Sequence, residues 1–219
     1  MTSYSLELTS VPTFSKNKPK QIVVLCHGYG GDGKDISSLA IGWNRFLPDA
    51  IFLCPNAPEI CSINPSGYEW FDLSSEKKEI IFEKSLVAEK KLNNFLDEVL
   101  DDFQLNPSNL ALVGFSQGCM ISIQAAFKRK KTIACLIGYS GRVINKKHLS
   151  SSIISKPKTY LMHGQNDPIV PPMHLLEAKE FFSKIGHKIK TKMFKNCEHR
   201  IPVEGSSIGL EFLIKNLSQ

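Results

Sequence analysis

The sequence predicts an α/β fold in which a mostly parallel sheet is covered by helices on both faces. Two observations predict it. Short apolar runs alternate with longer segments of helical periodicity along the chain, and most runs are apolar without a break, as in strands buried on both faces. The chain has 219 residues and no linker-like stretch, so residues 1–219 are expected to form a single domain.

The first half of the chain supplies three expected strands and a long helix. Residues 4–8 alternate apolar and polar side chains, which predicts an edge strand. Residues 21–26 (QIVVLC) and 50–54 (AIFLC) are nearly continuous apolar runs, as in buried strands. Residues 80–102 repeat apolar side chains at helical spacing and predict a helix. Residues 55–75 contain three prolines and are expected to be irregular.

The second half continues the alternation to the end of the chain. Its apolar runs predict four strands, and the segments between them have the spacing of helices that cover a sheet. The expected strands are 110–115, 134–139, 159–163 and 190–194, and the expected helices are 117–127, 172–185 and 206–217.

Composition excludes several classes of protein. The chain is 42% hydrophobic and 22% charged, which is typical of a folded globule and not of a disordered chain. It has no apolar run of about 18 residues, and residues 1–8 lack the features of a secretory signal. A cytoplasmic protein without stable membrane insertion is therefore expected. Four of the six cysteines lie in apolar runs, which predicts buried, reduced thiols and no metal site: Cys26, Cys54, Cys119 and Cys135.

Charge is unevenly distributed along the chain. Residues 1–110 hold 10 Lys or Arg and 15 Asp or Glu, whereas residues 111–219 hold 17 and 6. The basic half is compatible with an anionic partner such as a phospholipid surface. Its lysines are scattered on expected helix faces without interleaved aromatics, which favours a solvated surface. No nucleic-acid-binding motif accompanies the charge, so no nucleic-acid partner is expected.

The segment Gly114-Phe115-Ser116-Gln117-Gly118 matches the pattern G-x-S-x-G. An apolar strand leads into it and a helix follows, which is the setting of a nucleophile elbow. Side chains two residues before or after the serine are expected to collide with it, so glycines would hold its hydroxyl open to attack. The alternative is an ordinary strand-to-helix turn capped by a serine.

A serine hydroxyl needs a base, and in this architecture the order is Ser, then Asp or Glu, then His. Asp167 is the only aspartate after Ser116 and lies just past an expected strand, where such sheets build their sites. An aspartate that begins a turn before Pro168 is the alternative. Glu198 is a minor alternative carboxylate because it adjoins the candidate base.

Three histidines follow Asp167: His174, His187 and His199. His174 lies at the start of an expected helix, and His187 lies at a helix end where a capping role explains it. His199 lies in a loop between the last strand and the last helix, so we predict that it is the base. His27 and His163 each precede a glycine at a strand end and are expected to hold their loops.

An acyl transfer site also needs two N–H donors for the oxyanion. One is expected at Gln117, directly after the nucleophile, and the other in the loop after residues 21–26. That loop, HGYGGDG, has four glycines in seven residues, which lets the backbone approach a ligand closely. A phosphate-binding loop is the rival interpretation, but the known phosphate-loop patterns are absent from it.

Several segments together resemble one family. LCHGYGGDGKDI, APE…PSGYEWFDL, VGFSQGCM, HGQNDPIVP and the late His199 occur in the order seen in the phospholipase/carboxylesterase family of α/β-hydrolases. That family includes acyl-protein thioesterases and bacterial carboxylesterases, and the similarity covers roughly residues 20–215, closest to the carboxylesterase branch.

The resemblance implies a cofactor-free Ser–His–Asp hydrolase of esters or thioesters, with oxyanion donors at Tyr29 and Gln117. Two departures stand out. Cys119 occupies a position where Gly or Thr is usual, and the sequence EHRIP lacks the glycine that commonly precedes the base. The substrate is expected to be a small ester or acyl compound, lipids included, and a homodimer is left open. The alternatives are peptidase or dienelactone chemistry on the same fold and a catalytically silent ligand-binding module.

The stretch 60–75 is the expected wall of an acyl pocket. It carries Ile60 and Ile63 and then three aromatic residues, Tyr68, Trp70 and Phe71. Ordinary core packing of these side chains is the equal alternative.

Overall fold

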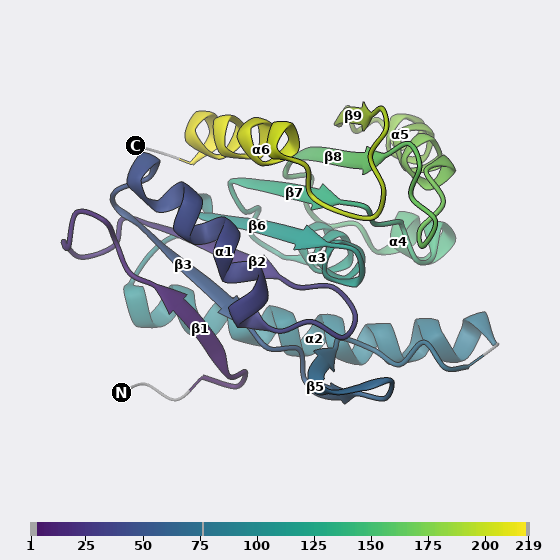
Figure 1. Ribbon diagram of the computed structural model, residues 1–219, viewed down its shortest axis with the longest axis horizontal. Coiled ribbons are helices and arrows are strands. Elements are labelled where there is room, and N and C mark those ends of the chain that lie inside the picture. The colour runs from purple at the N-terminus through teal and green to yellow at the C-terminus, as the bar shows by residue number, and fades with distance from the viewer. Residues whose placement is uncertain (1–3, 76, 218–219) are drawn as a thin grey trace.

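The computed structural model describes residues 4–75 and 77–217 and contains a seven-stranded sheet in the order β1-β3-β2-β6-β7-β8-β9 (Figure 1). β1 is antiparallel to β3, and the other neighbouring strands pair in parallel, so the predicted mostly parallel sheet is confirmed. The strands are β1 (Leu8–Val11), β2 (Gln21–Cys26), β3 (Ala50–Pro55), β6 (Leu110–Phe115), β7 (Cys135–Tyr139), β8 (Lys158–Gly164) and β9 (Lys190–Phe194).

Helices cover both faces of this sheet (Figure 1). One face packs against α1 (Gly33–Trp43) and α6 (Val203–Asn216), and the other against α2 (Lys78–Phe103), α3 (Gln117–Lys128) and α5 (Met173–Lys184). The short α4 (Lys146–Ser152) lies beside α3. Two 3-10 turns, η1 (Asn44–Phe46) and η2 (Pro107–Asn109), complete the helical segments. None of the described helices is both long and apolar enough to cross a bilayer.

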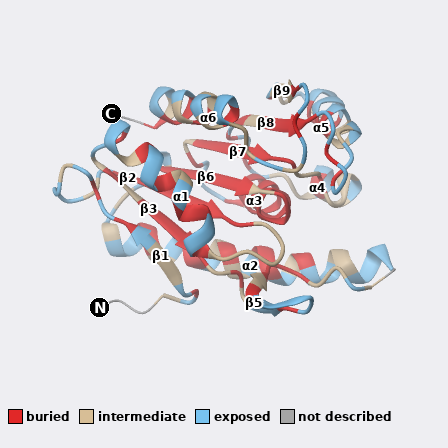
Figure 2. Cartoon of the chain, viewed as in Figure 1, coloured by how far each residue is buried: buried red, intermediate tan, exposed pale blue. Residues whose placement is uncertain are grey.

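Strand β2 shows why the sheet has two cores. All six of its residues are buried (Figure 2). Because side chains alternate along a strand, Ile22 and Val24 pack in the cluster with α2 and α3, whereas Val23 and Leu25 pack in the cluster with α1 and α6. A strand with apolar side chains on both faces is stable only between two helical layers.

Helix α3 lies at the centre of the molecule. Every residue from 117 to 127 is buried, because α3 packs between the sheet and α2 (Figure 2). Its apolar residues occupy all sides, as expected of a helix enclosed by protein. The segment that follows β6 is thereby held in place on every side.

The predicted edge strand at residues 4–8 is wrong in position, because β1 begins only at Leu8. Tyr4 and Ser5, which precede β1, form hydrogen bonds with α2. The Tyr4 hydroxyl donates to Asp102 at 2.5 Å, and the Ser5 amide donates to Glu98 at 2.8 Å. Residues 4–6 therefore bind the helix, and pairing with β3 starts after them.

One hairpin and two helices were not expected from the sequence. Residues 55–75 are not irregular throughout, since they contain the antiparallel hairpin of β4 (Glu59–Cys61) and β5 (Asn64–Glu69). Helix α1 begins after Asp32, whose carboxylate caps it by accepting the Asp35 amide at 2.7 Å. Helix α4 is similarly capped by Asn145. The remaining expected elements are confirmed, with ends displaced by three residues or fewer.

The C-terminal ends of the parallel strands meet at one edge of the sheet. The loops after β2, β6, β8 and β9 begin there, and they carry the candidate residues His27, Ser116, Asp167 and His199. This edge is where open α/β sheets place their ligand sites.

Candidate active site

Ser116 lies on a strained turn between β6 and α3. Its backbone has φ 53° and ψ −117°, a left-handed conformation that a non-glycine residue adopts only under constraint. The Ser116 amide donates to Tyr139 O on the adjacent strand at 2.8 Å, which fixes the turn. This is the geometry of a nucleophile elbow.

The structure requires glycine at positions 114 and 118 of the elbow. The reason differs from the expected collision with the serine side chain. A Cβ at Gly114 would lie 2.4 Å from Gly118 O, and one at Gly118 would lie 2.1 Å from Cys26 O. The collisions are therefore with backbone atoms of α3 and β2, and not with the serine side chain. The two glycines let strand, helix and neighbouring strand approach closely.

Ser116, His199 and Asp167 form a continuous hydrogen-bonded chain. Ser116 Oγ lies 2.9 Å from His199 Nε2, and His199 Nδ1 lies 2.7 Å from Asp167 Oδ2. A carboxylate only accepts, so Nδ1 carries the proton and donates to it, and Nε2 then accepts the serine hydroxyl hydrogen. A serine whose hydroxyl faces an unprotonated imidazole nitrogen can be deprotonated as it attacks.

Asp167 is buried and has its other oxygen bound by the loop. Asp167 Oδ1 accepts the amides of Ile169 and Val170, each at 2.9 Å. Burial alone would raise the pKa of Asp167, but the bonds from the Val170 amide, from His199 and from the Ile169 amide outweigh it, so the pKa lies below its usual value. The carboxylate is therefore held ionised beside the imidazole.

The loop that carries His199 makes its turn without the glycine common in the family. Asn196 supplies the left-handed residue, with φ 53°. Gly164 gives the loop room, because a Cβ there would lie 2.4 Å from both Cys197 O and Glu198 O. The Asn166 amide, donating to Cys197 O at 2.9 Å, joins this loop to the Asp167 loop.

The second departure from the family pattern, Cys119, is a packing adjustment. Its sulfur lies 2.4 Å from the position a Cβ would take at either Gly138 or Gly141, so the thiol fills the space above two glycines. Burial raises the pKa of this thiol to about 12, which keeps it protonated.

His27 and His163 hold loops, as expected. His27 Nδ1 donates to Gly28 O at 2.7 Å, and its Nε2 accepts the Ala57 amide at 2.9 Å. Burial lowers the pKa of His27, so the ring is held neutral. His163 Nε2 donates to Val170 O at 2.8 Å and lies 3.2 Å from Asp167 Oδ2.

The other candidate bases lie elsewhere. His174, on α5, faces Glu177, with Nδ1 3.1 Å from its carboxylate. His187 packs edge-on against Phe127 and Phe182. His199 is thus the histidine that the structure brings to Ser116.

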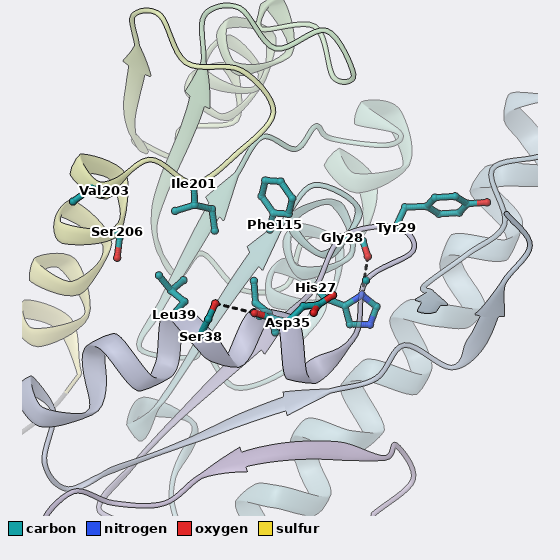
Figure 3. Close-up of a pocket in the computed structure, with 12 residues that line it drawn as sticks. His27, Gly28, Tyr29, Asp35, Ser38, Leu39, Phe115, Ile201, Val203 and Ser206 are labelled. Carbon is teal, nitrogen blue, oxygen red and sulfur yellow. Dashed lines mark hydrogen bonds between the residues drawn. The ribbon is translucent and has the colours of Figure 1, made fainter. Parts of the chain in front are cut away.

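Tyr29 and Gln117, the predicted oxyanion donors, lie on the two segments next to the serine. Gln117 is the first residue of α3, and amides in a first helical turn have no acceptor within the helix. Tyr29 is inside the turn closed by the Gly31 amide and Gly28 O at 3.1 Å. The Tyr29 hydroxyl lies 2.9 Å from Ser62 Oγ on the hairpin, and the Tyr29 ring points away from Phe115 (Figure 3).

The aromatic residues expected around an acyl pocket lie mainly in the core. Trp70 and Phe71 are 1% and 2% exposed and pack in the cluster with α2 and α3. The Trp70 indole N–H donates to His27 O at 3.0 Å. Tyr68 pairs with Gly31, and Ile60 and Ile63 are exposed on the hairpin. Direct contact of these side chains with a substrate stays a prediction.

A cavity of about 450 Å³ adjoins the elbow (Figure 3). It lies between α1 and the segment that connects His199 to α6, and residues 27–31 and Phe115 border it. The sequence did not predict it, because a cavity depends on how side chains from distant segments fill space.

The mostly parallel sheet carries a serine on a strained strand-to-helix turn, and later loops bring a histidine and a carboxylate to it. This combination defines the class of α/β-hydrolases. Within that class, the chain belongs to the phospholipase/carboxylesterase family, which it matches over residues 11–217.

Individual relatives agree with this assignment. The chain is 28% identical to "Acyl-protein thioesterase 1" of Kluyveromyces lactis, over 97% of this chain and 99% of that protein. It is 22% identical to "Esterase YpfH" of Escherichia coli strain K12, over 91% of this chain and 84% of that one. The crystal structure of esterase PE8 superposes with a TM-score of 0.92 at 32% identity, covering 97% of this chain and 99% of that chain.

Proposed function

We propose that this protein hydrolyses carboxylic esters or thioesters with Ser116 as nucleophile, His199 as general base and acid, and Asp167 as the carboxylate that orients His199. One observation carries the proposal: the hydrogen bonds of 2.9 and 2.7 Å that join these three side chains at the elbow. The esterase and thioesterase names of the relatives support the same reaction class.

In the proposed acylation, His199 Nε2 takes the hydroxyl proton while Ser116 Oγ bonds to the acyl carbon. The carbonyl oxygen becomes an oxyanion and accepts the backbone N–H groups of Tyr29 and Gln117. The imidazolium then gives the proton to the leaving oxygen or sulfur, and the bond from the acyl carbon to that atom breaks. Water, deprotonated by His199, repeats these steps on the acyl-enzyme and releases the acid.

The low pKa of Asp167 supports this scheme energetically. A carboxylate that stays ionised attracts the positive charge that develops on His199 during each proton transfer. Because its second oxygen is bound by two backbone amides, Asp167 holds the ring in one orientation and one tautomer.

A fluorophosphonate probe tests the nucleophile directly. We expect one adduct per chain, located at Ser116 by peptide mapping, and no adduct in Ser116→Ala. Ser140→Ala is the matched control, since Ser140 follows the neighbouring strand β7 and also has a positive φ of 49°. Unlabelled folded wild type, or labelling that persists in Ser116→Ala, would refute the proposal.

The substrate class is tested with a panel of p-nitrophenyl esters, acyl-CoAs and lysophospholipids. Hydrolysis of p-nitrophenyl esters alone would make the protein an ester hydrolase, and hydrolysis of acyl-CoAs would extend the activity to thioesters. In each case Ser116→Ala must abolish turnover for the activity to belong to this site.

A further inference from the structure

We infer that the cavity between α1 and the segment 199–206 binds the leaving group of the substrate, and that this leaving group is an apolar alcohol or thiol without a negative charge. The inference rests on the proposed function and adds to it the place and chemistry of the part of the substrate that departs first.

The cavity wall includes residues that lie next to the nucleophile. A Cβ built on Gly28, which borders the cavity, would lie 3.3 Å from Ser116 Cβ and 3.1 Å from the Phe115 ring. Phe115 borders the cavity as well and directly precedes Ser116. A substrate carbonyl bonded to the serine therefore has one substituent next to this space.

The side of the site on which the cavity lies identifies that substituent. The Phe115 and His199 rings are in contact, with centroids 4.9 Å apart, and Ile201 in the cavity wall follows His199 by two residues. A leaving atom must receive its proton from His199 Nε2, so it has to lie on the histidine side of the acyl carbon. The substituent that enters this cavity is therefore the alcohol or thiol.

Three apolar side chains form one part of the cavity wall. Leu39 from α1 and Ile201 point toward each other across the cavity, with Phe115 beside them (Figure 3). All three also pack against the core between α1, α6 and the sheet, so their positions are supported from behind. A pocket of this kind gains affinity from each methylene group that it removes from water.

The polar groups in the wall argue against an anionic ligand. Ser38 Oγ donates to Asp35 O at 2.8 Å, and Ser206 Oγ accepts the Trp43 indole N–H at 3.0 Å, so both hydroxyls already bond within the protein. The carboxylate at the cavity, that of Asp35, is exposed and would repel a phosphate or carboxylate.

The cavity is separate from the pocket expected around the aromatic residues of 60–75. Trp70 and Phe71 pack in the core on the α2 side of the sheet, whereas Leu39, Ile201 and Phe115 pack on the α1 and α6 side. Substitutions on the two faces can therefore be tested independently.

The test uses two ester series with the full-length protein. In alkyl acetates from methyl to hexyl the alcohol grows, and in ethyl esters from acetate to hexanoate the acid grows. Wild type should gain roughly threefold in kcat/KM for each methylene added to the alcohol until the cavity is full. Leu39→Trp fills the cavity and should lower the ratio of kcat/KM for hexyl acetate to that for methyl acetate. The ratio of kcat/KM for ethyl hexanoate to that for ethyl acetate should stay at its wild-type value.

Two further variants secure the test. Leu39→Ala enlarges the cavity and should extend the gain to longer or branched alcohols, which tests the inference even if the tryptophan variant fails to fold. Ile41→Trp is the matched control, because Ile41 lies on the same helix and is 62% exposed. It should keep both ratios.

If both Leu39 variants kept the wild-type ratios of kcat/KM, or if only the ratio of the acid series changed, the inference would be overturned. Fluorophosphonate labelling of Ser116 would still support the proposed function in that case. A protein that neither labels nor hydrolyses any ester would overturn the proposed function itself.

Discussion

The side-chain amide of Gln117 closes a hydrogen-bonded ring with the end of β5: Gln117 Oε1 accepts the Trp70 amide at 2.8 Å, and Gln117 Nε2 donates to Phe71 O at 2.6 Å. The Trp70 indole in turn donates to His27 O. The two segments proposed to supply the oxyanion donors, at Tyr29 and Gln117, are thus joined through one tryptophan.

Gln117→Met should therefore impair both folding and catalysis. The methionine has a similar length but leaves two buried backbone groups unpaired, each at a cost of about 1–3 kcal/mol. We expect a lower free energy of unfolding in urea and a fall in kcat at unchanged KM, measured where the variant is fully folded. Gln124→Met is the control: Gln124 is buried in the same helix, and its side-chain amide donates to Ser85 Oγ at 3.3 Å. Equal kcat in the two variants would show that the Gln117 side chain does not position the site.

Removal of the residues of the proposed triad should have strongly non-additive effects on kcat. Ser116→Ala and His199→Ala should each reduce kcat by a factor of about 10⁴ or more, and the double variant should lose little further, because the residues act as one unit. His174→Gln, on α5 and paired with Glu177, is the control and should keep wild-type kcat. If the loss of kcat in the double variant equalled the product of the two single losses, the two residues would not act as one unit.

Trp70→Ala separates a core role from a role in substrate binding. Because Trp70 is 1% exposed within the core, we expect a loss of about 3–5 kcal/mol in the free energy of unfolding. Activity should fall to the same degree for all acyl chain lengths at temperatures where part of the protein is unfolded. A profile that loses only its long-chain preference would instead place Trp70 against the substrate.

Stability should decline as the solution becomes mildly acidic. Burial lowers the pKa of His27, His163 and His187 in the folded chain, so the unfolded chain binds more protons below about pH 6.5. The free energy of unfolding should therefore be fully retained above that pH and decrease below it, by up to about 1.4 kcal/mol per pH unit for each group. Urea titrations from pH 7.5 to 5 measure the slope, and His27→Gln should make it shallower. Identical slopes would exclude a contribution from His27.

Local patterns in the sequence were sufficient for six strands of the main sheet, β2, β3, β6, β7, β8 and β9, and for the three residues in contact at the elbow. GFSQG after an apolar run marks the turn, Asp167 has no competing aspartate after Ser116, and His199 lies in the loop after the last strand. In a parallel sheet, strand ends meet at one edge, so loops distant in sequence are brought together by topology alone.

Features that depend on side-chain packing could not be predicted from those sequence patterns. The burial of Trp70 and the bonds of the Gln117 side chain require knowledge of how the hairpin meets α3. The cavity forms where Leu39 and Ile201 fail to fill the space between two helices, which is a property of volumes and not of spacing. Helix α1 is a different case, because Asp32 as its cap and Ile36, Ala40 and Trp43 on its buried face were readable signals.

The burial of α3 along residues 117–127 also indicates where this protein can change during evolution or engineering. A helix with protein on every side along residues 117–127 offers few positions at which substitutions are neutral. Random libraries in that segment would return mostly unfolded chains. Diversity introduced into α1 and residues 200–206, which have solvent on one side, should instead yield folded variants that differ in the alcohols they accept.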